Sequence, residues 1–141
     1  MDMADKVELG STEWLQAARE YLESRIAELG DALNGVKFSL CEVLTDPPAH
    51  LLHDGATQLA WQFRFDGKSV AVLPGDSADV DYRQVADYQS ILPMARIVYS
   101  EDPAALAASR ERRKDDNAPA LPMVLAPTLL AMHDHLARLT A

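Results

Sequence analysis

The chain has 141 residues, 48% of them apolar and 25% charged, which fits one globular domain over residues 1–141 and excludes a disordered or low-complexity protein. Its 13 Lys and Arg residues stand against 22 Asp and Glu residues, a formal net charge of −9. Such a charge repels the phosphates of nucleic acids and of anionic membranes, so we expect neither as a partner.

The first ten residues alternate charged and small apolar side chains. They lack the run of about 7 to 15 apolar residues found in a signal peptide, and no stretch of the chain approaches the ~20 apolar residues that span a bilayer. We therefore expect a cytoplasmic protein rather than an integral membrane protein, with residues 1–10 disordered or loosely packed.

Residues 11–33 repeat apolar side chains at the spacing of one helix face: Trp14, Leu15, Ala18, Tyr21, Leu22, Ile26, Leu29 and Leu33. This pattern predicts a helix that packs its apolar stripe on the core. Ser11 or Thr12 can cap the start of this helix, Gly30 weakens its end, and Asn34-Gly35 stops it.

Residues 36–43 alternate apolar and polar side chains, which is the period of a half-buried strand. Asp46-Pro47-Pro48 ends this strand, because proline donates no hydrogen bond to a sheet. We expect a loop over residues 45–55, with a short helical turn at residues 49–53.

Residues 58–74 form two apolar-rich runs joined by Asp66-Gly67, which predicts a β-hairpin with a two-residue type I′ turn. This turn would pair Phe65 with Lys68, Phe63 with Val70, and Trp61 with Val72. One face of the hairpin then carries the apolar side chains Leu59, Trp61, Phe63, Val70 and Val72. The other face is polar enough to meet water, so we expect helices to cover one face of the sheet only.

The remaining elements follow in chain order. Residues 78–85 alternate again and predict a further strand. Ser90 is expected to cap a helix with Pro93 at its third position, and Asp102-Pro103 to start another helix over residues 104–114. After a turn-rich connection over residues 115–122, residues 128–139 predict a terminal helix with Leu129, Met132 and Leu136 near one side.

Four short motifs carry a family resemblance: Asp66-Gly67-Lys68, Pro74-Gly75, Ala78-Asp79-Val80 and Ala86-Asp87-Tyr88. With the order of elements around them, residues 59–98 resemble the sterol-carrier-protein-like family of lipid-binding domains. The resemblance implies an α/β (α+β) fold, with a mostly antiparallel twisted sheet of about five strands covered by helices. It also implies an apolar tunnel between sheet and helices that holds a sterol, a fatty acid or an acyl-CoA-like molecule.

We expect the ligand-binding residues to be the large apolar side chains of the hairpin and of the later helices. They are Trp61, Phe63, Val70, Val72, Leu92, Leu129, Met132 and Leu136. Aromatic rings and methionine adapt well to irregular apolar ligands. The alternative for each residue is that it fills a solid core.

The sequence contains no convincing catalytic or metal-binding constellation. His133 and His135 would point about 200° apart on a helix, and His50 and His53 lack an evident third ligand. Adjacent pairs such as Asp81 and Tyr82 would face opposite sides of a strand. With Cys41 as the only cysteine, a Cys-based zinc site is excluded. We expect no catalytic residue, no metal and no cofactor.

Other acid and phenol pairs are treated in the same way: Asp79 with Tyr82, and Asp87 with Tyr88, are expected to be solvated at the surface. The basic cluster Arg110, Arg112, Arg113 and Lys114 has two interpretations. A solvated helix end is favoured, because cations suit the negative end of the helix dipole. The alternative is a binding patch for a phosphate or CoA-like group.

These observations favour a small carrier or binding domain over an enzyme. Two alternatives stay open. One is a small enzyme with a cone-shaped α+β fold, like the ketosteroid isomerase and polyketide cyclase group, in which a buried carboxylate transfers a proton. The other is a non-catalytic accessory subunit that stabilises an enzyme partner. As protein partners, a second copy of this chain in a homodimer and a partner enzyme both stay open.

Overall fold

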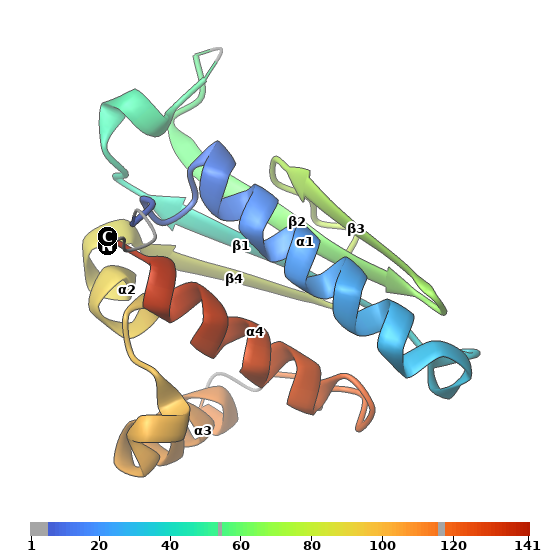
Figure 1. Ribbon diagram of the computed structural model, residues 1–141. Helices are drawn as coiled ribbons and strands as arrows, with labels where there is room; N and C mark the ends of the chain where they lie inside the picture. Colours follow the sequence, from blue (N-terminus) through green and yellow to red (C-terminus); the bar gives the residue numbers. More distant parts are fainter. Residues whose placement is uncertain (1–5, 54, 116–117) are drawn as a thin grey trace, which may run out of the picture.

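The computed structural model describes residues 6–53, 55–115 and 118–141. Two long helices lie across one face of a four-stranded sheet, and two further helices lie beside its edge (Figure 1). The predicted α+β class is confirmed, with four strands rather than about five and with a mixed rather than an antiparallel sheet.

The first helix, α1, spans Thr12–Leu29, and a 3₁₀ turn over Gly30–Leu33 follows it. Ser11 is its N-cap, since Oγ accepts a hydrogen bond of 3.2 Å from the backbone N–H of Trp14. The buried side of α1 carries Trp14, Ala18, Leu22 and Ile26. The predicted helix, its cap and its apolar stripe are therefore confirmed.

The sheet consists of β1 (Lys37–Thr45), β2 (Gln58–Asp66), β3 (Ser69–Pro74) and β4 (Tyr82–Asp87), in the order β3-β2-β1-β4. The pairs β1–β2 and β2–β3 are antiparallel, whereas β4 lies parallel to β1. The predicted strand over residues 78–85 thus starts later than expected. The reason is topological, because the chain must first cross the sheet from the β3 edge to the β4 edge.

The hairpin turn lies one residue beyond its predicted position. Asp66 pairs with Ser69 and Phe63 with Val72, so the two-residue turn is Gly67-Lys68. Gly67 has a φ of 58°, which is the position that glycine takes in a type II′ turn. The predicted pairing of Phe63 with Val70 is wrong by two residues. Because side chains alternate with period two, the predicted apolar face is unchanged.

The other face of the sheet is not open to water as expected. The crossing segment of residues 75–81 lies on it, and Gln62 Nε2 donates to the carbonyl of Gly75 at 3.1 Å. Arg64 donates to Ser77 Oγ at 3.1 Å and to the carbonyl of Asp79 at 3.0 Å. As a result Gln62 and Cys41 are buried.

The remaining helices are α2 (Tyr88–Ala95), α3 (Pro103–Asp115) and α4 (Ala126–Leu139), with 3₁₀ turns over Ala49–Leu51 and Tyr99–Glu101. The cap of α2 is Asp87, not Ser90, since the Asp87 carboxylate accepts from the backbone N–H of Ser90 at 3.0 Å. Pro93 therefore lies inside the helix, which ends two residues later. Asp102 caps α3 as predicted, because its Oδ1 accepts from the backbone N–H of Ala105.

Residues 6–10 are packed rather than loose. The backbone N–H of Val7 donates to the carbonyl of Leu139 at 2.7 Å, and Leu9 and Gly10 are buried. Residues 1–5 lie outside the described part of the chain. Within that part, no helix is both long enough and apolar enough to cross a bilayer.

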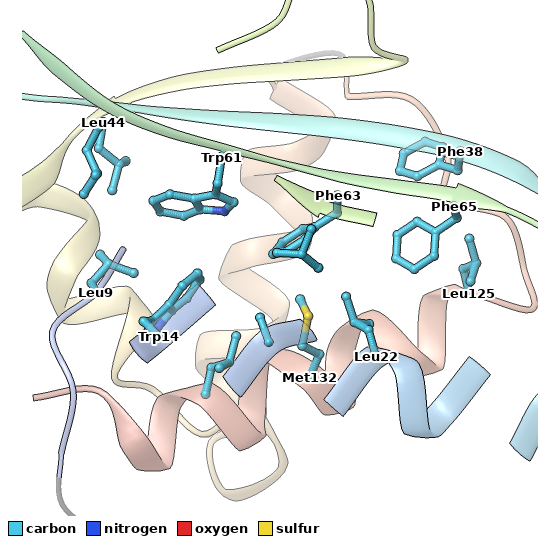
Figure 2. Close-up of a cluster of buried hydrophobic side chains, with 14 of the residues drawn as sticks. Leu9, Trp14, Leu22, Phe38, Leu44, Trp61, Phe63, Phe65, Leu125 and Met132 are labelled. Atoms are coloured by element: carbon cyan, nitrogen blue, oxygen red, sulfur yellow. The ribbon is translucent and has the colours of Figure 1, made fainter. Parts of the chain in front are cut away.

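The core lies between the sheet and the helices α1 and α4. Figure 2 shows Trp61, Phe63 and Phe65 projecting from the sheet toward the helices, where Trp14, Leu22 and Met132 meet them. The rings of Trp14 and Trp61 lie 4.9 Å apart between centroids, tilted by 53°.

Candidate ligand cavity

A cavity of about 560 Å³ lies between the β1–β4 half of the sheet and the helices α2, α3 and α4. This volume is typical of small-molecule sites, which measure about 300 to 1,000 Å³. Its apolar wall includes Leu9, Trp14, Trp61, Phe63, Met132 and Leu136. Its polar groups include Glu42 and Gln84 on the floor formed by the sheet, Arg112 and Arg113 at the mouth beneath α3, and Ser90 and His133 on α2 and α4.

Four of the eight predicted ligand-binding residues line this cavity: Trp61, Phe63, Met132 and Leu136. Val70, Leu92 and Leu129 pack against the core instead, and Val72 is part of it. The difference arises because α1 covers the hairpin half of the sheet, where Arg19 donates to the carbonyl of Val72 at 2.7 Å. The cavity therefore lies closer to β4 than expected.

The floor of the cavity carries a carboxyl group, Glu42, at the middle of β1. Its cross-strand neighbours are Trp61 on β2 and Gln84 on β4. Residues at alternate positions share one face of a strand, so Glu42 lies on the face that holds Phe38 and Leu44, both buried. A carboxyl group thus interrupts the apolar face of the central strand.

Burial raises the pKa of Glu42 from 4.5 to about 7, and the indole N–H of Trp61 offsets part of this rise. Part of the Glu42 side chain faces the open cavity, so the residue is half-buried rather than fully buried. No basic side chain contributes to the pKa. At neutral pH this group exists in both protonation states, which is the condition for giving or taking a proton.

The indole of Trp61 is 1% exposed, and its Nε1 has no hydrogen-bond partner of acceptable geometry among the described residues. It lies near enough to the Glu42 carboxylate to lower the pKa of that group, yet it is not aligned for an ordinary hydrogen bond. By contrast, Trp14 Nε1 donates to Thr140 Oγ1 at 3.3 Å. A buried N–H without a partner is costly, and such groups in native proteins call for an explanation.

His133 also lines the cavity but is held by other contacts. Its Nε2 lies 3.0 Å from the carbonyl of Ile97, and its ring stacks on Tyr99 with 4.2 Å between centroids. A carbonyl only accepts, so Nε2 carries the proton. Burial lowers the pKa of His133, which keeps the ring neutral.

The mouth of the cavity is basic. Arg112 and Arg113 reach it from the last turn of α3, and Tyr82 lies opposite them on β4. The Arg113 guanidinium lies 5.6 Å from the centre of the Tyr82 ring and donates to the carbonyl of Pro119 at 2.8 Å. From the sequence, a solvated helix end is the favoured interpretation of this basic cluster. In the structure, two of its members, Arg112 and Arg113, also line the cavity.

The acid and phenol pairs weighed from sequence have structural contacts instead. Asp81 accepts from the backbone N–H of Ser39 at 2.7 Å, and Asp87 caps α2. Tyr88 donates to the carbonyl of Leu9 at 3.0 Å. Among the histidines, His50 lies 2.7 Å from a Glu8 carboxylate oxygen.

Sequence reasoning missed Glu42, although a signal for it was present. Val36, Phe38, Leu40 and Leu44 occupy alternate positions around it, so a strict reading of the period places an acidic residue on the apolar face. Within the part of the chain that the structure describes, no three His, Cys, Asp or Glu side chains lie close enough together to hold a metal ion.

Comparison with known proteins gives no relative: no protein-family model, curated protein or solved structure matches this chain.

Proposed function

We propose that this protein binds a small, mainly apolar molecule in the cavity, with a polar group of that molecule against Glu42 and Trp61. One observation carries the proposal: a cavity of ligand size holds a carboxyl group and an indole N–H without an aligned partner on the floor that the sheet forms. A cavity of this volume that combines an apolar wall, convergent polar groups and a perturbed pKa is typical of binding sites.

A solid core would not need these two groups. Burying a carboxyl group and an indole N–H without full hydrogen bonding costs free energy, which apolar residues of similar volume would avoid. A ligand oxygen near Trp61 Nε1 would satisfy the indole N–H. A hydroxyl oxygen would accept a hydrogen bond from protonated Glu42 or donate one to its carboxylate, whereas a carbonyl oxygen would accept only from the protonated acid.

The resemblance of residues 59–98 to sterol-carrier-like domains supports the same class of ligand. It suggests that the ligand is a sterol, a fatty acid or an acyl chain, and that the protein carries this ligand without changing it chemically. The apolar wall of the cavity, with its two tryptophans and Met132, is suited to such a molecule.

Native mass spectrometry of the protein as purified tests this proposal. We expect a single non-covalent adduct that disappears under denaturing conditions. Where the adduct is lost during purification, added decanol should bind and change the tryptophan emission. A protein with no adduct, and with emission that stays unchanged on addition of decanol, would contradict the proposal.

A second candidate function is proton transfer on the bound molecule, because a carboxyl group with a pKa near 7 in a ligand cavity suits a general base. Glu42 would remove a proton from a carbon next to a ligand carbonyl, and the Trp61 N–H would stabilise the resulting enolate oxygen. Returning the proton to another carbon would complete an isomerisation. Deuterium uptake from heavy water into the identified ligand, lost in Glu42→Gln, would distinguish this enzyme from a carrier.

A further inference from the structure

We infer that the ligand is an amphipathic anion, which enters the cavity neutral end first and leaves a carboxylate or phosphate at the mouth against Arg112 and Arg113. The inference rests on the proposed function, since it requires an occupied cavity. It adds the chemical class of the ligand, its orientation and the residues that select it.

The arginines at the mouth, Arg112 and Arg113, have no carboxylate partner within the described part of the chain. Arg83, which also lines the cavity, is neutralised by Asp76 through hydrogen bonds of 2.8 and 2.6 Å. Among the described residues, Arg112 makes no hydrogen bond or ion pair, and the Arg113 guanidinium lies against the Tyr82 ring and donates to the carbonyl of Pro119. The chain has nine more acidic than basic residues, yet two neighbouring guanidinium groups have no carboxylate partner among the described residues, which makes them candidates for an outside anion.

The position of α3 also favours an anion at the mouth. None of its side chains is fully buried, and only Ala105, Leu106, Ser109 and Arg113 are half-buried, so its packing on the rest of the fold is light. Contacts of Arg113 with the Tyr82 ring, Ala118 and Pro119 hold the last turn of α3 in place. That arrangement presents planar guanidinium groups at the entrance, and such groups bind carboxylates and phosphates through two parallel hydrogen bonds.

The charged groups of the cavity also determine the orientation of the ligand. An anionic group at the floor would lie beside Glu42 in apolar surroundings, and two like charges there repel each other strongly. A neutral end avoids this repulsion, and a hydroxyl or carbonyl on it would satisfy the Trp61 N–H. The charges of the cavity therefore favour one direction of entry, with the anion outward.

The chain provides its own reporter for the test. Both of its tryptophans, Trp14 and Trp61, line the cavity, so tryptophan emission follows binding without a label. Titrations would use decanol, decanoic acid and decyl phosphate, which share the apolar chain and differ in the head group. The variants are Arg112→Gln, Arg113→Gln and both together, with Arg110→Gln as the control because Arg110 lies on the same helix and does not line the cavity.

We expect decanoic acid or decyl phosphate to bind about tenfold more tightly than decanol at low salt. Each single variant should weaken anion binding about threefold, and the double variant about tenfold, with decanol unaffected. The stronger of the two anions identifies the head group. The Arg110→Gln protein should behave like the parent.

Equal affinities for decanol and both anions, with no effect of the variants, would overturn the inference and leave the proposed function intact. If the double variant loses affinity for decanol as much as for the anions, the inference is also overturned, since α3 would then only close the cavity. If no probe changes the emission of the parent protein, the proposed function fails together with the inference.

Discussion

At the scale of single residues, Glu42 links the stability of the fold to the chemistry of the cavity. The pKa of its carboxyl group rises from 4.5 to about 7 in the folded protein because burial removes water from it. The folded state therefore binds the proton more tightly than the unfolded state between these two values. The cost of the charged form is absent below about pH 4.5, grows as pH rises, and is complete above about pH 7.

Glu42→Gln removes this titration and keeps the shape of the side chain. Relative to the parent, the variant should gain up to about 3 kcal/mol in free energy of unfolding between about pH 5 and pH 8. Urea denaturation at a series of pH values measures the difference. Glu23→Gln is the control, since Glu23 is exposed on α1. A stability difference for Glu42→Gln that does not change with pH would show that this carboxyl group is not perturbed.

The sequence contained part of this result. The alternation along residues 36–44 places Glu42 on the apolar face, so its burial could have been predicted from the strand alone. The unpaired N–H of Trp61 could not. Whether a buried donor finds an acceptor depends on the orientation of one ring among neighbours that are distant in sequence, such as Trp14 and Glu42, and no local pattern encodes that orientation.

At the scale of elements, α3 differs from the other helices because it carries no buried side chain. Helices held by few buried contacts open locally at a lower free energy than those packed in the core. We therefore expect the amides of α3 to exchange with solvent much faster than those of α1 and α4 in hydrogen-exchange measurements. Decanoic acid should slow the exchange of α3 more than decanol does, and protection of α3 equal to that of α1 in the free protein would contradict this account.

The hairpin and β4 show which features of the sheet a local sequence pattern predicts and which it does not. Alternation correctly predicted which hairpin side chains share a face, but a shift of two residues preserves that alternation and leaves the register open. The parallel pairing of β4 with β1 was not predictable, since the period of a strand says nothing about its partner. The cavity lies beside β4. Its position therefore could not be predicted without knowing that β4 pairs with β1.

At the scale of the whole molecule, the net charge of −9 sets the long-range field, while Arg112 and Arg113 act only at the mouth of the cavity. The protein should therefore stay in the supernatant when anionic vesicles or duplex DNA are pelleted at physiological salt. A polybasic peptide serves as the positive control. Sedimentation with vesicles that disappears at high salt would show that the basic end of α3 dominates the surface.

The central claim is that a ligand occupies space beside Met132, and calorimetric titration of decanoic acid into Met132→Trp tests it most directly. Met132 lines the cavity, whereas Leu125 is fully buried in the same core and does not line it. Tryptophan at position 132 should fill the cavity and abolish binding, with stability within about 1 kcal/mol of the parent, while Leu125→Trp should overpack the core and cost about 1 to 3 kcal/mol. A parent protein that releases no heat, together with a Met132→Trp variant as destabilised as Leu125→Trp, would contradict the account.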